Sequence, residues 1–499
     1  MPYVYEIPAV NGKPLVEIPK ELKDKVIDYT VLRDKIIIKA SDLVDQLLYE
    51  PRVKVRDEMG RIVSRITEYS YPPVASAIVC KDEDYVYAYR PANNFKGYIL
   101  IDKGEAGVDD AKVIQIAVNS IAEQGTVSIA KDDYNIDSEI TIPSGVSVFG
   151  EKGKSYTRGG TTDKSKAVTL KAMVGINSIF KVEGKSNIEN IEFDANNLAS
   201  YAVDALRTSL TVDRATFINC DFRRATEAGV NGDKHDGLTF ERCGFTENNK
   251  GFIVPTSIGG LVLFEKCLFA DNKVCDIETL SVDTIEIRAS TFANGQNLTD
   301  AQIVVKGGMN ALYMVNCWME NGINGNIRGE YVEGSGRPSL SIVNCRLQVP
   351  SNSNSANIIG NWNRVILVGR TTLRTLGTAS YCIDLDYANA LMIFGANLED
   401  KPINGGNIAW KYVRDSNFQY YRKYLKTFSG DGSTTTFKFA HGLIDNPTKV
   451  IVSPVSDDAR AAGPVSGWGD GAGNIVIKFN SAPPAGTNNV VVVVEAEVF

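Results

Sequence analysis

The middle of the chain repeats a short pattern at intervals of 23 to 29 residues. "FERCGFTENN" begins at Phe240, and "FEKCLFADNK" begins 24 residues later at Phe264. A period in the twenties that runs over about 200 residues indicates a solenoid, in which each repeat forms one coil stacked on the next. The large apolar residue of the pattern recurs at Phe193, Phe222, Phe245, Phe269, Phe292, Met319, Leu347, Leu373 and Leu398.

A second column of residues lies two positions before the first. Its members are Ile191, Cys220, Cys243, Cys267, Ser290, Cys317, Cys345, Thr371 and Ala396. Residues two apart on a strand point to the same face, so both columns should face the interior. Because Ser, Thr and Ala replace Cys along the column, we interpret the cysteines as interior packing residues rather than as nucleophiles or ligands. The Asn and Gly residues that follow each pattern are suited to corners between strands.

Two kinds of solenoid have a period of this length. Leucine-rich repeats need dense leucine and a helix or tight turn in each repeat. The coils here are rich in Val, Ile, Phe and Thr, and helical periodicity is absent from 180 to 410. These features favour a parallel β-helix, and the fold class is predicted to be mainly β.

The sequence predicts three parts. Residues 1–100 are dense in mixed charges and are expected to form a separate α+β segment. Residues 101–420 are expected to form the β-helix, which begins with a capping helix from Asp109 or Asp110 to about Gln124. Residues 421–499 alternate apolar and polar positions between Gly, Pro and Asn turns, which is typical of an antiparallel β-sandwich.

Composition argues against several functions. The net charge of −7 does not favour a nucleic-acid partner. No apolar run is long enough to span a membrane, and the N-terminus lacks the pattern of a secretory signal peptide. The chain has two His and no Cys-x-x-Cys pair, so no metal site is predicted. No phosphate-binding loop is present, so no cofactor is predicted either.

The stretch from residue 104 to 150 resembles the opening of the pectate-lyase-like superfamily of right-handed parallel β-helices. That opening has an acidic pair, a helix of the form A-[IL]-Q-x-A, and short strands separated by Gly. The family's Pro-x-Gly before the tyrosine is replaced here by residues 130–133. The matching residues are Asp109, Asp110, Ile114, Gln115, Ala117, Gly125, Val127, Ile129, Tyr134, Ile140, Ile142, Gly145, Val146 and Gly150.

The C-terminal 75 residues resemble the β-domains of viral tail-fibre and tailspike proteins, especially those of archaeal viruses, spindle-shaped ones among them. "TFSGDGSTTTFKFAHGL" and "APPAGTNNVVVVVEAE" carry this likeness. The resemblance implies a virion protein, assembled in the host cytoplasm, that attaches to a host surface glycan or glycoprotein. It further implies that residues 1–100 bind a tail or adaptor protein and that the chain forms a homo-oligomer, most often a trimer.

Two other functions stay open at this point. The chain could be a free polysaccharide lyase or glycoside hydrolase of the same fold, or a structural virion component without glycan contact. An enzyme would need paired carboxylates, or a base with a neutralising cation.

The second strand of each coil supplies candidate site residues. An alignment of inward residues leaves an outward column that contains Asp204, Asn231, Asp276 and Arg328. Asp276 and Glu278 are two apart on one strand, about 6.5 Å, which is the spacing of an inverting acid pair. The residues predicted to be catalytic are Asp233, His235, Asp236, Asp276 and Glu278. The residues predicted to bind glycan are Asp204, Asn231, Arg328 and Trp318. The alternative is that these side chains form an ordinary solvated face.

Overall fold

A computed structural model describes most of the chain, which divides into two compact units, residues 1–255 and 256–499. The described residues from 75 onward are 75–91, 98–121, 124–151, 168–205, 214–233, 237–256, 258–280, 282–307, 311–399, 403–405, 408–414, 421–443 and 446–498. Before residue 75 the description covers the backbone of six strands: β1 (Tyr3–Val10), β2 (Lys13–Pro14), β3 (Val26–Val31), β4 (Lys35–Ala40), β5 (Val53–Arg56) and β6 (Ile62–Ile66). The first four form an antiparallel sheet in the order β2-β1-β4-β3, and β5 pairs with β6. The helical part of the α+β segment expected here lies outside the described residues.

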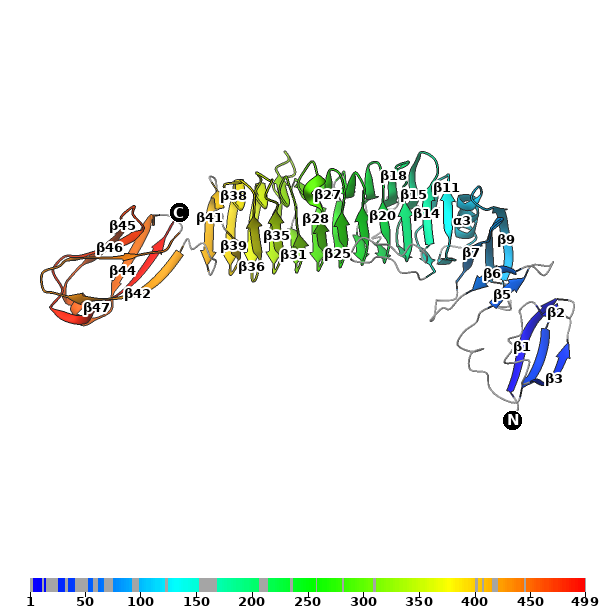
Figure 1. Cartoon of the computed structure of the whole chain (residues 1–499), viewed down its shortest axis with the longest axis horizontal. Coiled ribbons are helices and arrows are strands. Elements are labelled where there is room, and N and C mark those ends of the chain that lie inside the picture. The colour runs from blue at the N-terminus through cyan, green and yellow to red at the C-terminus, as the bar shows by residue number, and fades with distance from the viewer. Residues whose placement is uncertain are drawn as a thin grey trace. The chain divides into compact units, whose positions relative to one another are not determined.

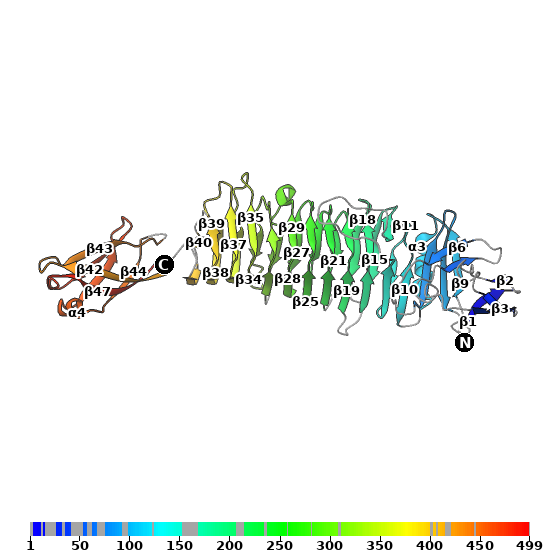
Figure 2. The ribbon, with the colours of Figure 1, turned by 60° about the horizontal axis from the view of Figure 1, so that its bottom comes forward.

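The first unit contains stacked coils with three parallel strands each. Strands of equivalent position pair from coil to coil and form three columns, and successive strands of a column lie side by side in Figures 1 and 2. The A column is β10 (Gly125–Ile129), β13 (Val146–Gly150), β16 (Ser186–Glu189), β19 (Arg214–Ile218) and β22 (Gly237–Glu241). The B column is β11 (Asp133–Ile136), β14 (Val168–Ala172), β17 (Ile191–Asp194), β20 (Asp221–Arg223) and β23 (Gly244–Thr246). The C column is β12 (Ile140–Ile142), β15 (Ile176–Val182), β18 (Ala199–Ala205), β21 (Ala228–Asn231) and β24 (Lys250–Val254).

The second unit repeats the same three-column plan. Its A column is β25 (Ile258–Glu265), β28 (Val282–Arg288), β31 (Ala311–Val315), β34 (Ser339–Val343) and β41 (Ile408–Arg414). Its B column is β26 (Leu268–Ala270), β29 (Thr291–Ala293), β32 (Trp318–Met319), β35 (Arg346–Val349), β37 (Thr372–Thr375) and β39 (Asn397–Glu399). Its C column is β27 (Cys275–Leu280), β30 (Ile303–Lys306), β33 (Ile327–Glu330) and β40 (Ile403–Gly405). Two long strands, β36 (Ile358–Val368) and β38 (Ile383–Phe394), run through both the C and the A column. A short 3-10 helix, η2 (Gly295–Asn297), lies in one corner.

The predicted fold class is therefore confirmed. The repeats form a parallel β-helix, as the resemblance to the pectate-lyase-like proteins implied. No helix in the described part of the chain is long and apolar enough to cross a membrane.

Large apolar side chains fill the interior in register. In the first unit, the rings of Phe193 and Phe222 stack at 5.5 Å between centroids, and Phe222 lies 5.0 Å from Phe245. In the second unit, Phe269 and Phe292 stack at 4.7 Å. These rings are fully buried, so the periodic phenylalanines form a continuous apolar core within each unit.

The second interior column, which contains the Cys, Ser and Thr residues, forms hydrogen bonds in addition to filling space beside these rings. The backbone N–H of Cys267 donates to Ser290 Oγ at 3.0 Å, and that of Cys317 donates to Cys345 Sγ at 3.3 Å. The backbone N–H of Cys345 is 3.5 Å from Thr371 Oγ1. Cys, Ser and Thr share one position because each is small and each offers an acceptor to the coil before it.

This pattern gives a direct prediction for Cys345. The Cys345→Ser variant should unfold with a free energy within about 1 kcal/mol of the parent, because a serine at the same column position already accepts such a bond. Cys345→Val should cost about 1–3 kcal/mol, because the buried N–H of Cys317 loses its acceptor. Urea denaturation of the two variants measures the difference. Equal losses of stability in the two variants would show that position 345 requires only a side chain of suitable volume and no hydrogen-bond acceptor.

Corners form at left-handed residues on both sides of the B column. The expected corners after the pattern are present at Asn196, Asn294 and Asn321, which have positive φ angles. A second corner, just before the pattern, was not expected, and Asn219 and its counterparts in other coils occupy it. Seven residues with positive φ form this corner: Asn190, Asn219, Arg242, Lys266, Ala289, Asn316 and Asn344. The recurring Asn before Cys was the signal for it in the sequence.

The helix predicted near residue 110 is α3 (Asp110–Asn119), which is shorter than expected. It contacts β7 (Ala77–Lys81), β8 (Tyr85–Pro91) and β9 (Tyr98–Glu105), and β7 pairs with the first A strand. Asp110 is buried and accepts hydrogen bonds from Lys81 Nζ at 2.8 Å and from the backbone N–H of Asn135 at 2.7 Å. The acidic residue of the family motif therefore ties the helix to the first coils. The predicted boundary at residue 100 falls inside β9.

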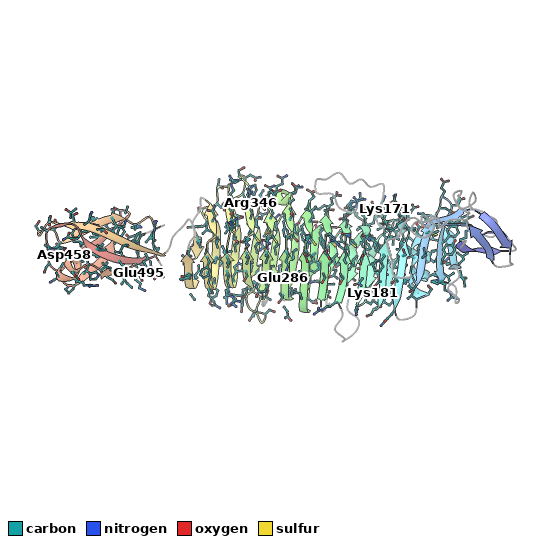
Figure 3. All side chains as sticks on the ribbon, turned by 90° about the horizontal axis from the view of Figure 1, so that it is seen from below. Lys171, Lys181, Glu286, Arg346, Asp458 and Glu495 are labelled. Carbon is teal, nitrogen blue, oxygen red and sulfur yellow. The ribbon has the colours of Figure 1, made fainter. Side chains whose placement is uncertain are left out.

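The C-terminal residues form the expected antiparallel sandwich. One sheet has the order β42-β47-β44 and the other β43-β46-β45. Alternate residues of β47 are fully buried, whereas Glu495 on its other face pairs with Lys423 at 2.7 Å (Glu495 is labelled in Figure 3). The elements are β42 (Tyr421–Gly430), β43 (Thr436–Ala440), β44 (Lys449–Pro454), α4 (Asp457–Ala461), β45 (Val465–Gly469), β46 (Asn474–Phe479) and β47 (Gly486–Glu497).

Candidate functional site

The C-column strands of the first unit bend, so that side chains from their two ends converge. Asp204 in β18 pairs in register with Lys181 in β15, a residue labelled in Figure 3. Asn177 lies four residues before Lys181 on the same strand, yet its Nδ2 donates to Asp204 Oδ2 at 3.3 Å. A straight strand would keep these groups more than about 10 Å apart. The bend therefore brings together outward residues that sequence spacing separates.

Two carboxyl groups share the Asn177 amide at this bend. Glu139, just before β12, accepts from Ser178 Oγ at 2.6 Å and from Asn177 Nδ2 at 3.4 Å. On the other side, Asn231 Nδ2 donates to Asp204 Oδ1 at 2.9 Å. Because Glu139 and Asp204 both contact one nitrogen, they are close enough to act as a pair on one substrate, as the acids of glycoside hydrolases do at about 5–9.5 Å.

The electrostatics of the bend favour a protonated acid. Burial raises the pKa of Asp204, and the nearby carboxylates of Glu139 and Asp233 raise it further, whereas hydrogen bonds from Asn177 and Asn231 oppose the shift. Burial and the same acidic surroundings raise the pKa of Tyr201. Asp204 thus keeps its proton to a higher pH than an exposed aspartate.

Three of the predicted residues of this unit lie at the bend. Asp204 and Asn231 are register partners on neighbouring coils, and Asp233 lies in the turn after β21, where its charge acts on Asp204. His235 and Asp236 lie outside the described residues. The functional roles assigned to all five residues stay predictions.

Sequence reasoning missed Glu139, Asn177 and Tyr201. Glu139 precedes β12, whose partner in the next coil begins at residue 176. This interval exceeds the repeat period, so no periodic signal marks Glu139. Asn177 and Tyr201 are on repeating strands, but the spacing of residues in the sequence does not indicate that these strands bend.

The second unit differs from the predicted alignment. Ile277, not Cys275, is the register partner of Ile303, so Glu278 is in register with Val304, which is fully buried, and with Arg328. Asp276 is 1% exposed, and its Oδ1 accepts from Asn272 Nδ2 at 2.7 Å. Asp276 is therefore buried rather than solvated beside Glu278, and the catalytic roles assigned to both residues stay predictions. The register of β27 is shifted by two residues from the alignment, so Asp276 lies two residues before the position in register with Val304, and its side chain is buried there.

Arg328 lies at an equivalent bend in the second unit. It is the register partner of Val304, and Asp300, four residues before Val304, binds it. Arg328 Nη1 is 2.5 Å from Asp300 Oδ1, and its Nη2 is 2.8 Å from Glu330 Oε1. Two carboxylates therefore neutralise the guanidinium that was predicted to bind glycan.

Trp318 lies on a different column from Arg328. It belongs to β32 in the B column, is 40% exposed, and has the guanidinium of Arg346 at 5.5 Å from its ring (Arg346 is labelled in Figure 3). The exposed ring offers a surface for stacking, but the structure does not bring it together with Arg328.

A second acidic cluster lies on the B column of the first unit. Glu192 and Asp221 are register partners, and Arg223 Nη2 lies 2.6 Å from Glu192 Oε1. Burial, with a smaller contribution from Glu192, raises the pKa of Asp221 to about 7. A Cβ on Gly244 would lie 2.3 Å from Asp221 Oδ1, so the glycine of "CGF" makes room for this carboxyl group.

Asp194 completes this cluster. Arg223 and Arg224 both bind it, and these contacts hold the pKa of Asp194 below its usual value despite its burial. The paired charges are typical of a structural ion network. Among the residues that the structure describes, no group of three or more His, Cys, Asp or Glu side chains is arranged to hold a metal ion.

No family model matches the chain. Solved structures with a similar fold include the A-module of mannuronan C-5 epimerase AlgE6 from Azotobacter vinelandii, with 13% identity, a TM-score of 0.39, and coverage of 62% of this chain and 96% of that one. The tailspike protein of Acinetobacter phage vB_ApiP_P1 has 12% identity and a TM-score of 0.37 over 82% of this chain and 92% of its own. Tailspike gp49 of Acinetobacter baumannii bacteriophage Fri1, a capsular polysaccharide depolymerase, has 9% identity and a TM-score of 0.31 over 83% and 92%. A likeness at this level does not define a substrate.

Proposed function

We propose that this protein binds a host surface glycan along its β-helix and cleaves it with the acid pair at the C-column bend. The observation that carries the proposal is the pairing of Glu139 and Asp204 through Asn177, together with the raised pKa of Asp204. Two carboxyl groups in different environments are what acid-catalysed glycoside hydrolysis requires.

The roles follow from the contacts. Asp204 is the general acid, because its surroundings favour the protonated form that can protonate the oxygen of a glycosidic bond. Glu139, oriented by Ser178 and Asn177, acts as the second carboxylate. Asp233 and Tyr201 interact electrostatically with Asp204, so we assign them contacts with the bound sugar.

At the level of the whole protein, we propose a viral tailspike located in the virion tail. The succession of an antiparallel N-terminal sheet, a β-helix and a C-terminal sandwich supports separate roles in virion attachment, glycan binding and assembly. In this proposal residues 1–100 bind the virion tail or an adaptor, and the chain works as a homotrimer.

Substitution of Asp204 tests the catalytic proposal. Asp204→Asn keeps the size of the side chain but removes the proton donor, so the cleavage rate on a susceptible capsular or envelope polysaccharide should fall at least about 100-fold. Glu139→Gln should give a similar loss. New reducing ends measure hydrolysis, and ultraviolet absorbance of unsaturated products measures elimination.

Asp221→Asn is the matched control, because Asp221 also has a raised pKa but lies on the B column. It should retain full activity. Loss of activity in Asp221→Asn with normal activity in Asp204→Asn would move the site to the B column. Unsaturated products would identify a lyase instead of a hydrolase, and glycan binding without any products would identify an attachment protein.

A further inference from the structure

A short hairpin after β33 holds Tyr331 and Arg337 opposite each other. Val332 and Gly336 form an antiparallel bridge, and Gly334 and Gly336 have φ angles of 82° and 83°. The glycines allow this tight reversal, because other residues rarely adopt such angles. Tyr331 and Arg337 flank the bridge, so the hairpin presents both side chains at one end.

Arg337 is held between two tyrosine rings. Its guanidinium carbon lies 4.8 Å from the ring centroid of Tyr331 and 3.9 Å from that of Tyr387. Tyr387 is in β38, where its hydroxyl donates to Asn389 Oδ1 and its register partner is Asn361. Contacts with two rings fix the plane of the guanidinium and shield its faces from water.

Within the described part of the chain, Arg337 has no carboxylate partner. Its Nε is buried and makes no hydrogen bond, in contrast to Arg328 nearby in sequence, which binds both Asp300 and Glu330. Glu333, in the same hairpin, is the acidic residue closest along the chain; it is exposed and forms no ion pair with Arg337 in the described part of the chain. Glu330 binds Arg328, and Asp386 accepts from Asn361 Nδ2 at 3.3 Å. A guanidinium that is fixed in position and lacks a counter-ion is suited to bind an external anion through two parallel hydrogen bonds.

The groups around Arg337 favour a sugar as the carrier of that anion. Tyr331 is 51% exposed, so its outer ring face is open to the apolar face of a pyranose. Asn389 Nδ2 donates to Asn363 Oδ1 at 2.8 Å, and Asn363 Nδ2 donates to Ser339 Oγ at 3.3 Å. Ser339 is buried, but the exposed amides of Asn363 and Asn389 offer both donors and acceptors to sugar hydroxyl groups.

We propose that this hairpin, with Tyr387, forms a binding subsite for an acidic saccharide. A uronate carboxylate binds Arg337, and the sugar ring stacks on Tyr331. The subsite is separate from the acid pair at the C-column bend, and it narrows the proposed glycan ligand to one that carries carboxylates. This inference rests on the proposed function for the expectation that the ligand is a glycan. The contacts around Arg337 are independent of that function.

The test compares two probes, oligogalacturonate and the same oligomer with its carboxyl groups reduced to neutral galactose units. The full-length protein should bind the acidic oligomer more tightly, and added NaCl should weaken that binding. Arg337→Gln should reduce affinity for the acidic oligomer about 10- to 100-fold and leave the neutral oligomer unchanged. Isothermal titration calorimetry measures all four affinities.

Matched variants make the result specific. Arg346→Gln removes another arginine that lies over an aromatic ring, Trp318 on the B column, and should not change the affinity. If Arg337→Gln fails to fold, Tyr331→Ala provides the test, because this exposed ring can be removed without opening the core, and it should weaken binding of both oligomers. Equal affinity of the parent protein for both oligomers, or unchanged binding in the Arg337→Gln and Tyr331→Ala variants, would overturn the proposal.

The two proposals fail in different ways. Cleavage that depends on Asp204 but not on Arg337 would refute the proposed acidic subsite and support the proposed catalytic site. Binding that depends on Arg337 in a protein that releases no products would support the subsite and refute the proposed catalysis.

Discussion

Asp276→Asn is expected to raise the free energy of unfolding at pH 8 by about 2–4 kcal/mol and to change it little at pH 4. Asp276 is 1% exposed, its Oδ1 accepts from Asn272, and its Oδ2 has no hydrogen-bond partner. Burial, with a contribution from the charge of Asp271, raises the pKa of Asp276 to about 7. An uncharged amide of the same shape avoids the cost of ionising this group inside the protein.

The direction of the pH dependence follows from the shift. In the unfolded chain an aspartate releases its proton near pH 4, whereas folded Asp276 keeps it to about pH 7. Between these values the folded state binds more protons, so the stability of the parent protein should fall as pH rises from about 4 to about 7. The part of this pH dependence that Asp276 causes should be absent when the stability of the Asp276→Asn variant is measured against pH.

Urea denaturation of both proteins at pH 4, 6 and 8 measures the effect. Asp283→Asn is the control, since Asp283 lies on the exposed face of the following strand and should change stability by less than about 0.5 kcal/mol. An Asp276→Asn variant that is less stable than the parent at pH 8 would show that the ionised carboxylate is stabilised in the fold.

Phe222→Ala is expected to lower the free energy of unfolding by about 3–5 kcal/mol. Its ring is fully buried and has four neighbouring rings, which belong to Phe193, Phe217, Phe240 and Phe245 at 5.5, 5.6, 6.0 and 5.0 Å. Removal of the ring leaves a cavity lined by rigid aromatic groups that cannot collapse to fill it.

Thermal and urea unfolding of Phe222→Ala and Phe222→Leu measure the loss. The leucine variant should recover more than half of the stability, because it refills most of the volume. Leu198→Ala, at a residue of the same unit that is 40% exposed, should cost less than about 1 kcal/mol. Equal losses of unfolding free energy in Phe222→Ala and Leu198→Ala would contradict a core of stacked rings around Phe222.

The interior of the coils could be predicted from the sequence because it is periodic. Positions equivalent to Cys220 and Phe222 recur in each coil at a two-residue spacing, filled mostly by small and by large apolar residues respectively, and that spacing defines one face of a strand. The outward C column was harder to predict, because the corner between the B and C columns changes length from coil to coil. A shift of two residues in the register of β27 puts Glu278, not Asp276, in register with Val304, and Asp276 is buried.

The candidate site depends on curvature, which leaves no periodic mark in a sequence. Asp204 and Asn231 could be found because they are register partners. Glu139 and Asn177 could not, since they reach Asp204 through a bend in the strands and from a coil that falls outside the regular period. Arg337 also escaped prediction, because its significance comes from the two rings around it and the lack of a counter-ion.

The burial of the cysteines, inside and outside the second interior column, has a consequence for the covalent chemistry of the fold. All eight cysteines of the chain lie in the described residues, and all are buried thiols. Burial raises the pKa of the Cys382 thiol to about 12, which keeps it in its unreactive protonated form at neutral pH. The fold therefore contains no disulfide bond, and its formation requires no oxidant.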